Sequence, residues 1–136
     1  MRLPLLLTAL IAATPAIAGS SGPHGRYIID VDATYQALVD AKAATETSRG
    51  TLERQKELIF LDFTGDTLSF VAGPKLGGGV KGRCRWRLDK DLILTEACGQ
   101  PDGRPFSVTG QIGFDADSCT LSVTGNAPVP IRYRAQ

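Results

Sequence analysis

Three cysteines carry the most distinctive chemistry in this sequence, and their odd number allows at most one bridge within the chain. Cys84 and Cys98 lie on two segments that are expected to pair as a β-hairpin. In an antiparallel meander the start of one strand lies beside the end of the next, so the sequence predicts a Cys84–Cys98 disulfide. Cys119 falls at the other end of the sheet and is expected to stay unpaired. We expect it to be a small buried apolar residue rather than a nucleophile, because the folded domain holds no histidine to activate it.

Few other residues form a pattern that catalysis or metal binding requires. His24 is the only histidine, and it precedes the first expected strand. The glycine-rich stretch 73–82 lacks the Gly-Lys-Ser/Thr ending of a phosphate loop and is expected to be a flexible loop that could gate one end of the sheet. The aspartates of residues 89–91 and 115–117 lack the glycine and the distal glutamate of a calcium loop. The sequence therefore predicts no metal site, no cofactor and no enzymatic activity.

The amino-terminal residues have the pattern of a secretory signal peptide. Arg2 precedes an apolar run over residues 3–13, and Ala16 and Ala18 supply the small side chains of a signal-peptidase site. We predict a signal peptide at residues 1–18, a flexible lead-in at 19–25 and a single β-barrel domain at 26–136, in a periplasmic or secreted protein. The chain has 15 basic and 14 acidic residues, so loss of Arg2 leaves equal numbers, and this balance does not favour a nucleic-acid partner.

The clearest amphipathic strand lies at residues 81–88, where apolar side chains alternate with arginines. We expect Leu88 to pair with Leu92 across the loop 89–91, which places Trp86 opposite Leu94 in the core. The other face then carries a row of cations. This basic face could contact an acidic protein or a membrane surface, although solvation of the strand is the simpler interpretation. Its residues are Arg83, Arg85 and Arg87.

Eight short segments of alternating or apolar character follow one another, mostly across tight turns. Closure into a barrel removes the exposed edges of such a sheet. A helix is expected from Ala33 to about Thr47, with Asp32 as its N-cap, and a long strand is expected over residues 106–114, bent at Gly110. The sequence thus predicts a mainly β fold, an eight-stranded antiparallel up-and-down barrel with one helix between strands one and two.

Gly25-Arg26-Tyr27 at the first strand and Arg134 in the last resemble the lipocalin-like, or calycin, barrels, in which a Gly-x-Trp on strand one packs against an arginine of the final strand. The resemblance implies that Gly25, Tyr27 and Arg134 close one end of the barrel, with Tyr27 in place of the tryptophan. The helix after strand one is similar to that of the fatty-acid-binding branch, but the Arg-x-Tyr of that branch is absent. Small periplasmic inhibitors of metalloproteases are also similar, as eight-stranded barrels with one disulfide and a mobile amino-terminal arm.

These observations predict that a small apolar or amphipathic molecule binds inside the barrel. Gly110 adds no side chain to fill the lumen, and residues 73–82 could open one end. The alternative is a protein-interaction module of the cell envelope, such as a protease inhibitor. The residues expected to point into the lumen and contact the ligand are Ile59, Leu61, Phe63, Leu94, Phe106, Val108 and Ile112.

Overall fold

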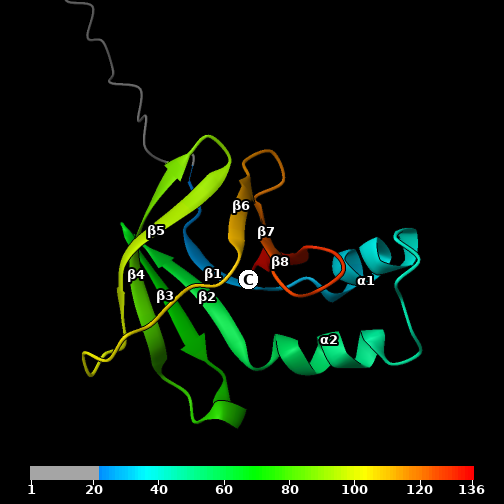
Figure 1. Ribbon diagram of the computed structural model, residues 1–136, viewed down its shortest axis with the longest axis horizontal. Helices are drawn as coiled ribbons and strands as arrows, with labels where there is room; N and C mark the ends of the chain where they lie inside the picture. Colours follow the sequence, from blue (N-terminus) through cyan, green and yellow to red (C-terminus); the bar gives the residue numbers. More distant parts are fainter. Residues whose placement is uncertain (1–21) are drawn as a thin grey trace, which may run out of the picture.

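The computed structural model describes residues 22–136, so the predicted signal peptide and the first residues of the lead-in lie outside the described part. Eight antiparallel strands follow the order of the chain and close into a barrel (Figure 1). This confirms the predicted fold class. The strands are β1 (Gly25–Ile29), β2 (Ile59–Thr64), β3 (Thr67–Ala72), β4 (Val80–Asp89), β5 (Leu92–Gly99), β6 (Gln111–Asp115), β7 (Thr120–Thr124) and β8 (Ile131–Ala135).

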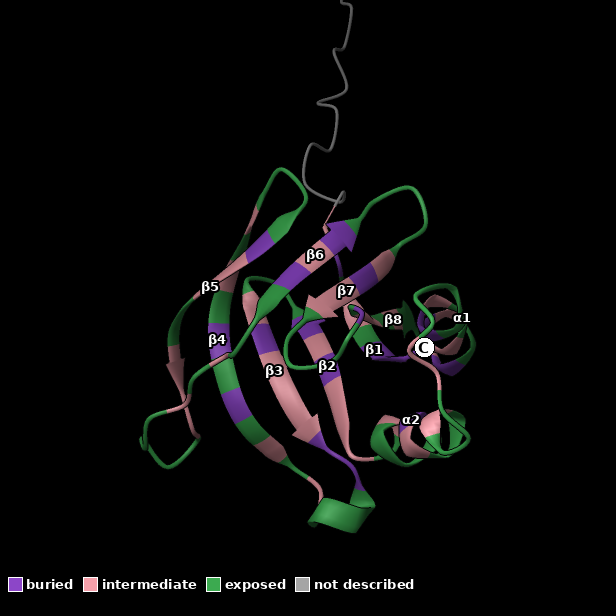
Figure 2. Cartoon of the chain, turned by 45° about the vertical axis from the view of Figure 1, so that its right-hand side comes forward, coloured by how far each residue is buried: buried purple, intermediate pink, exposed green. Residues whose placement is uncertain are grey.

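Two helices, α1 (Val31–Asp40) and α2 (Ser48–Lys56), occupy the connection, where one helix from Ala33 to about Thr47 was expected. The N-cap of α1 is Asp30 rather than Asp32, because the Asp30 carboxylate accepts a hydrogen bond of 3.0 Å from the backbone N–H of Ala33. The first helix ends early, and Lys42 beyond it has a positive φ of 56° that a helix cannot contain. The helices lie beside each other on one flank of the barrel (Figure 1, Figure 2).

The interior holds two clusters of buried side chains. The larger fills the barrel towards the end where the β2–β3, β4–β5 and β6–β7 turns lie, and it includes Phe63, Leu68 and Leu121. The smaller joins the two helices to β1 and to the segment before β8, through residues such as Ile29, Leu38 and Leu52. Buried and exposed positions alternate along β4, as a strand with one wet face requires (Figure 2).

The β4–β5 hairpin is one residue out of the expected register. Leu88 pairs with Ile93 rather than with Leu92, so the turn has two residues instead of three. A slip of one residue exchanges the two faces of a strand. Ile93 therefore lies in the core, while Leu94 lies opposite the exposed Arg87 on the outer face. The prediction that Leu94 points into the lumen is wrong.

Strand β8 closes the barrel against β1, but not through the predicted contact of Arg134 with Tyr27. Gly25 opens β1, and Tyr27 is buried in the core. Arg134 pairs with Ile28, the residue after Tyr27, and successive residues of a strand point to opposite faces. Arg134 therefore lies on the outer face and is exposed, so the predicted contact between Tyr27 and Arg134 is wrong.

A disulfide joins β4 to β5, and it confirms the predicted pairing. The Sγ atoms of Cys84 and Cys98 lie 2.06 Å apart. Cys119 is free, as expected, but it is exposed in the β6–β7 turn with a positive φ of 53°, not buried. It lies in this turn because β7 begins only at Thr120.

Loss of this disulfide should destabilise the fold. The double variant Cys84→Ala/Cys98→Ala is expected to lower the free energy of unfolding by about 3 kcal/mol, because the bridged residues are 14 apart and the bridge restricts that loop in the unfolded chain. Urea denaturation measures the change, with Cys119→Ala as the matched control of little effect. Equal stability of the double variant and the wild type, or a Cys119-containing disulfide in a non-reduced peptide map, would contradict the assignment.

Candidate functional site

A cavity of about 350 Å³ lies inside the barrel, at the end where β2, β4, β6 and β8 begin. Side chains from six of the eight strands line it, and most of them are apolar. The larger core cluster fills the lumen beyond the cavity and shares Leu61 and Ile112 with the cavity wall. This cavity therefore occupies one end of the lumen.

Five of the seven residues predicted to contact a ligand line this cavity: Ile59, Leu61, Phe106, Val108 and Ile112. The other two lie elsewhere. Phe63 also points inward but is sealed deep in the core at 2% exposure, and Leu94 lies on the outer face. The alternation of inward-facing residues along the strands therefore predicted most of the cavity wall. Phe63 faces inward too, but it lies further along the lumen, in the packed core.

Residues 106–109 form one wall of the cavity and are not part of a strand. The expected strand over 106–114 begins only at Gln111, because Gly110 has a positive φ of 84° and turns the chain. A Cβ on Gly110 would lie 1.8 Å from the carbonyl oxygen of Thr124, so the backbones meet there at a distance that only glycine allows. Strands β5 and β6 pair at only two positions, which leaves residues 106–109 free to pass along the cavity.

The ring of Phe106 packs against the backbone of Gly82 in β4. A Cβ on Gly82 would lie 2.5 Å from the ring of Phe106, so the ring rests directly on the buried backbone of β4. The ring centroid of Phe106 also lies 5.1 Å from that of Phe70, another residue of the wall. The prediction missed both Gly82 and Phe70. A glycine inside an alternating strand often marks a close approach, and this was the signal that could have found Gly82.

The polar groups of the cavity are few. Lys81 lines it, and so do the hydroxyl-bearing residues Ser107, Thr109 and Tyr133. Burial raises the pKa of Tyr133, so its hydroxyl stays protonated, and it has no hydrogen-bond partner among the described residues. An apolar cavity with a small number of polar groups is the usual form of a site for a small molecule.

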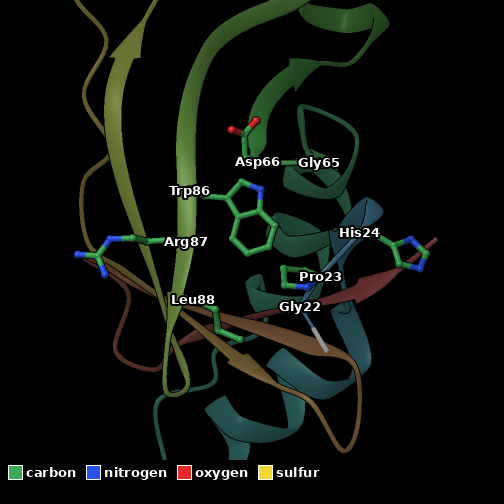
Figure 3. A pocket seen from close by; sticks show the side chains of 8 residues that line it. All are labelled: Gly22, Pro23, His24, Gly65, Asp66, Trp86, Arg87 and Leu88. Atoms are coloured by element: carbon green, nitrogen blue, oxygen red, sulfur yellow. The ribbon is translucent and has the colours of Figure 1, made fainter. Parts of the chain in front are cut away.

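A second hollow, of about 480 Å³, lies towards the opposite end of the barrel and is bordered by Gly22 and Pro23 (Figure 3). Its main side chain is Trp86, which packs edge-on against Phe63 at a centroid distance of 5.3 Å. A Cβ on Gly22 would lie 2.9 Å from the indole, and the indole Nε1 is buried without a partner among the described residues. Trp86 thus serves packing, and His24 points away from it in Figure 3. Because fewer side chains converge here, the barrel-end cavity is the better candidate site.

The predicted basic face forms an exposed row along the outer side of β4. Arg85 pairs with Asp66 at 3.3 Å across the outer surface. Arg83 and Arg87 form no ion pair with any residue in 22–136. The row is therefore a local concentration of positive charge in a chain with almost equal numbers of acidic and basic residues.

Comparison of this chain with models of protein families, with curated proteins and with solved structures finds no match. The fold and the cavity define a class of protein: a small antiparallel up-and-down barrel whose lumen is hollow at one end. That architecture is compatible with the lipocalin-like resemblance. No helix within residues 22–136 has the length and apolar character needed to cross a membrane.

Proposed function

We propose that this protein is a non-enzymatic binding protein that holds a small apolar or amphipathic molecule in the cavity at the end of its barrel. The observation that carries the proposal is the convergence of apolar side chains from six strands on one hollow of about 350 Å³. Pockets for small ligands have volumes of roughly 300–1,000 Å³, so this cavity suits a ligand at the small end of that range. The lipocalin-like resemblance supports the same kind of function.

The proposed setting is the periplasm or the extracellular space. The Cys84–Cys98 disulfide supports it, since such bonds form and persist in oxidising compartments. The predicted cleavage after Ala18 lies outside the described residues, and intact-mass analysis of the exported protein tests it. A retained Met1 would contradict export by this route.

Uptake of the neutral, environment-sensitive dye N-phenyl-1-naphthylamine tests the proposed site. Dye fluorescence should rise and saturate at one dye per chain, and native mass spectrometry of the exported protein should show a co-purifying small molecule. Val108 lies in the cavity wall outside the regular strands, so Val108→Trp should fill the cavity while the barrel persists. We expect this variant to bind the dye about tenfold more weakly, a loss of about 1.4 kcal/mol.

The exposed Leu76 offers the matched control, because Leu76→Trp adds a similar side chain outside the cavity. This variant should bind the dye like the wild type, and thermal unfolding should show that both variants are folded. Absence of dye uptake and of any co-purifying molecule in the wild type would reject the proposal.

The exposed basic face favours a second candidate function, a module that contacts an acidic protein or a membrane surface. The observation behind it is that Arg83 and Arg87 lie in one exposed row and have no acidic partner among the described residues, whereas Arg26 on β1 pairs with Asp62. A protein without dye uptake that sediments with anionic vesicles, and no longer does so as Arg83→Gln/Arg87→Gln, would support this function instead.

A further inference from the structure

Lys81 is placed at the cavity by an irregularity in the sheet. Phe70 pairs with Gly82, whereas the next pair along the ladder joins Val71 to Val80, so Lys81 is left as the extra residue of a β-bulge. A bulge changes the direction of a side chain relative to the alternation of the strand. Lys81 lines the cavity and is also exposed, which puts its side chain at the opening.

The charge of Lys81 is not balanced by any ion pair within residues 22–136. Among the described residues that line the cavity, Lys81 is the only one with a charge. It takes part in none of the ion pairs of residues 22–136, whereas Lys75, on the preceding 3₁₀ turn (Pro74–Leu76), pairs with Glu57. The nearest charge along the same strand is Arg83, which is also positive.

Hydrogen-bond donors lie in the same cavity. The exposed residues Ser107 and Thr109 of the wall segment carry hydroxyl groups and line the cavity, as does Tyr133 of β8. A hydroxyl can donate to an anionic oxygen, and such charge-assisted hydrogen bonds are stronger than neutral ones. Cation and hydroxyl donors at the rim of an apolar cavity form a surface that an anion with an apolar tail would complement.

We propose that the ligand is an anionic amphipathic molecule, whose charged end pairs with Lys81 while its apolar part enters the barrel. The inference rests on the proposed function and specifies the class of ligand for the same cavity. Neutral apolar molecules of the same size would enter with lower affinity, because they form no ion pair with Lys81.

Displacement of N-phenyl-1-naphthylamine by decanoate and by decan-1-ol tests the inference, since the two probes share their chain and differ in the charge of the head. Decanoate should displace the dye at about two- to fivefold lower concentration than decan-1-ol at low salt, and high salt should reduce the difference. Butyrate, which has the head without the chain, should not displace the dye. Lys81→Met keeps the aliphatic stem, so it should abolish the preference for decanoate, chiefly by weakening displacement by decanoate.

Arg83→Met is the matched control, because it removes the same charge two residues away on the same strand and outside the cavity. It should keep the preference for decanoate. Equal displacement by the two probes in the wild type, or an unchanged preference in Lys81→Met, would overturn the inference while dye uptake still supported a binding protein. An equal loss in both variants would also overturn it, since the charge would then act through the whole row. No dye uptake by the wild type would reject the proposed function itself.

Discussion

Replacing Phe63 with alanine is expected to lower the free energy of unfolding by about 3–5 kcal/mol. Phe63 is 2% exposed and forms the centre of an aromatic group, with ring centroids 5.6 Å from Tyr27 and 5.3 Å from Trp86. Both contacts are edge-on, so neither neighbour can move into the space without losing its own packing. Because a domain of this size is stabilised by roughly 5–15 kcal/mol in total, the variant should lose a large part of its stability.

Urea denaturation followed by the fluorescence of Trp86, the one tryptophan of the chain, measures this effect. Leu92→Ala is the control, because Leu92 is apolar but 37% exposed, and truncation there should cost about 1 kcal/mol or less. A loss as small as that of the control at Phe63 would show that this half of the lumen is not packed. The cavity at the end of the barrel would then extend further into the lumen.

The period-two alternation predicted the eight strands and their closure, because a half-buried strand must show it wherever it lies. Register was less certain, since it depends on the type of turn. Residues 89–91 can form a turn of two or three residues, and that single choice decided whether Ile93 or Leu94 would enter the core. The incorrect choice of turn is the reason that Leu94, one of the seven predicted ligand-contacting residues, lies outside the lumen.

Local pattern predicted a bend at Gly110, but neither the start of the strand only after it nor the bulge at Lys81. Phe106, Val108 and Ile112 alternate as in a strand, yet the approach of Gly110 to the backbone of Thr124 bends the chain between them, and that approach depends on a residue 14 positions away. The bulge at Lys81 likewise arises from the pairing with β3. Sequence patterns therefore identified the apolar wall of the site, while the elements that shape its opening depend on tertiary contacts.

The substitution Gly110→Ala should accordingly damage both the fold and the site. The positive φ of 84° is unfavourable for alanine by about 1–2 kcal/mol, and the added Cβ, 1.8 Å from the Thr124 carbonyl oxygen, must push two backbone segments apart at a further cost of about 1–3 kcal/mol. We expect a total loss of about 2–5 kcal/mol in the free energy of unfolding. Residues 106–109 directly precede Gly110 and form a wall of the cavity. A shift of Gly110 should therefore displace this wall and weaken uptake of the naphthylamine dye.

Gly103 separates the two contributions. Its φ of 87° is nearly the same, but a Cβ there would meet nothing within 4 Å, so Gly103→Ala should cost only the conformational part, about 1–2 kcal/mol, and should leave dye binding unchanged. Chemical denaturation and dye titration of the two variants side by side measure both effects. If Gly110→Ala were no less stable than Gly103→Ala, the contact between Gly110 and Thr124 would not be what bends the chain. If it were less stable but bound the dye normally, residues 106–109 would not form a wall of the binding site.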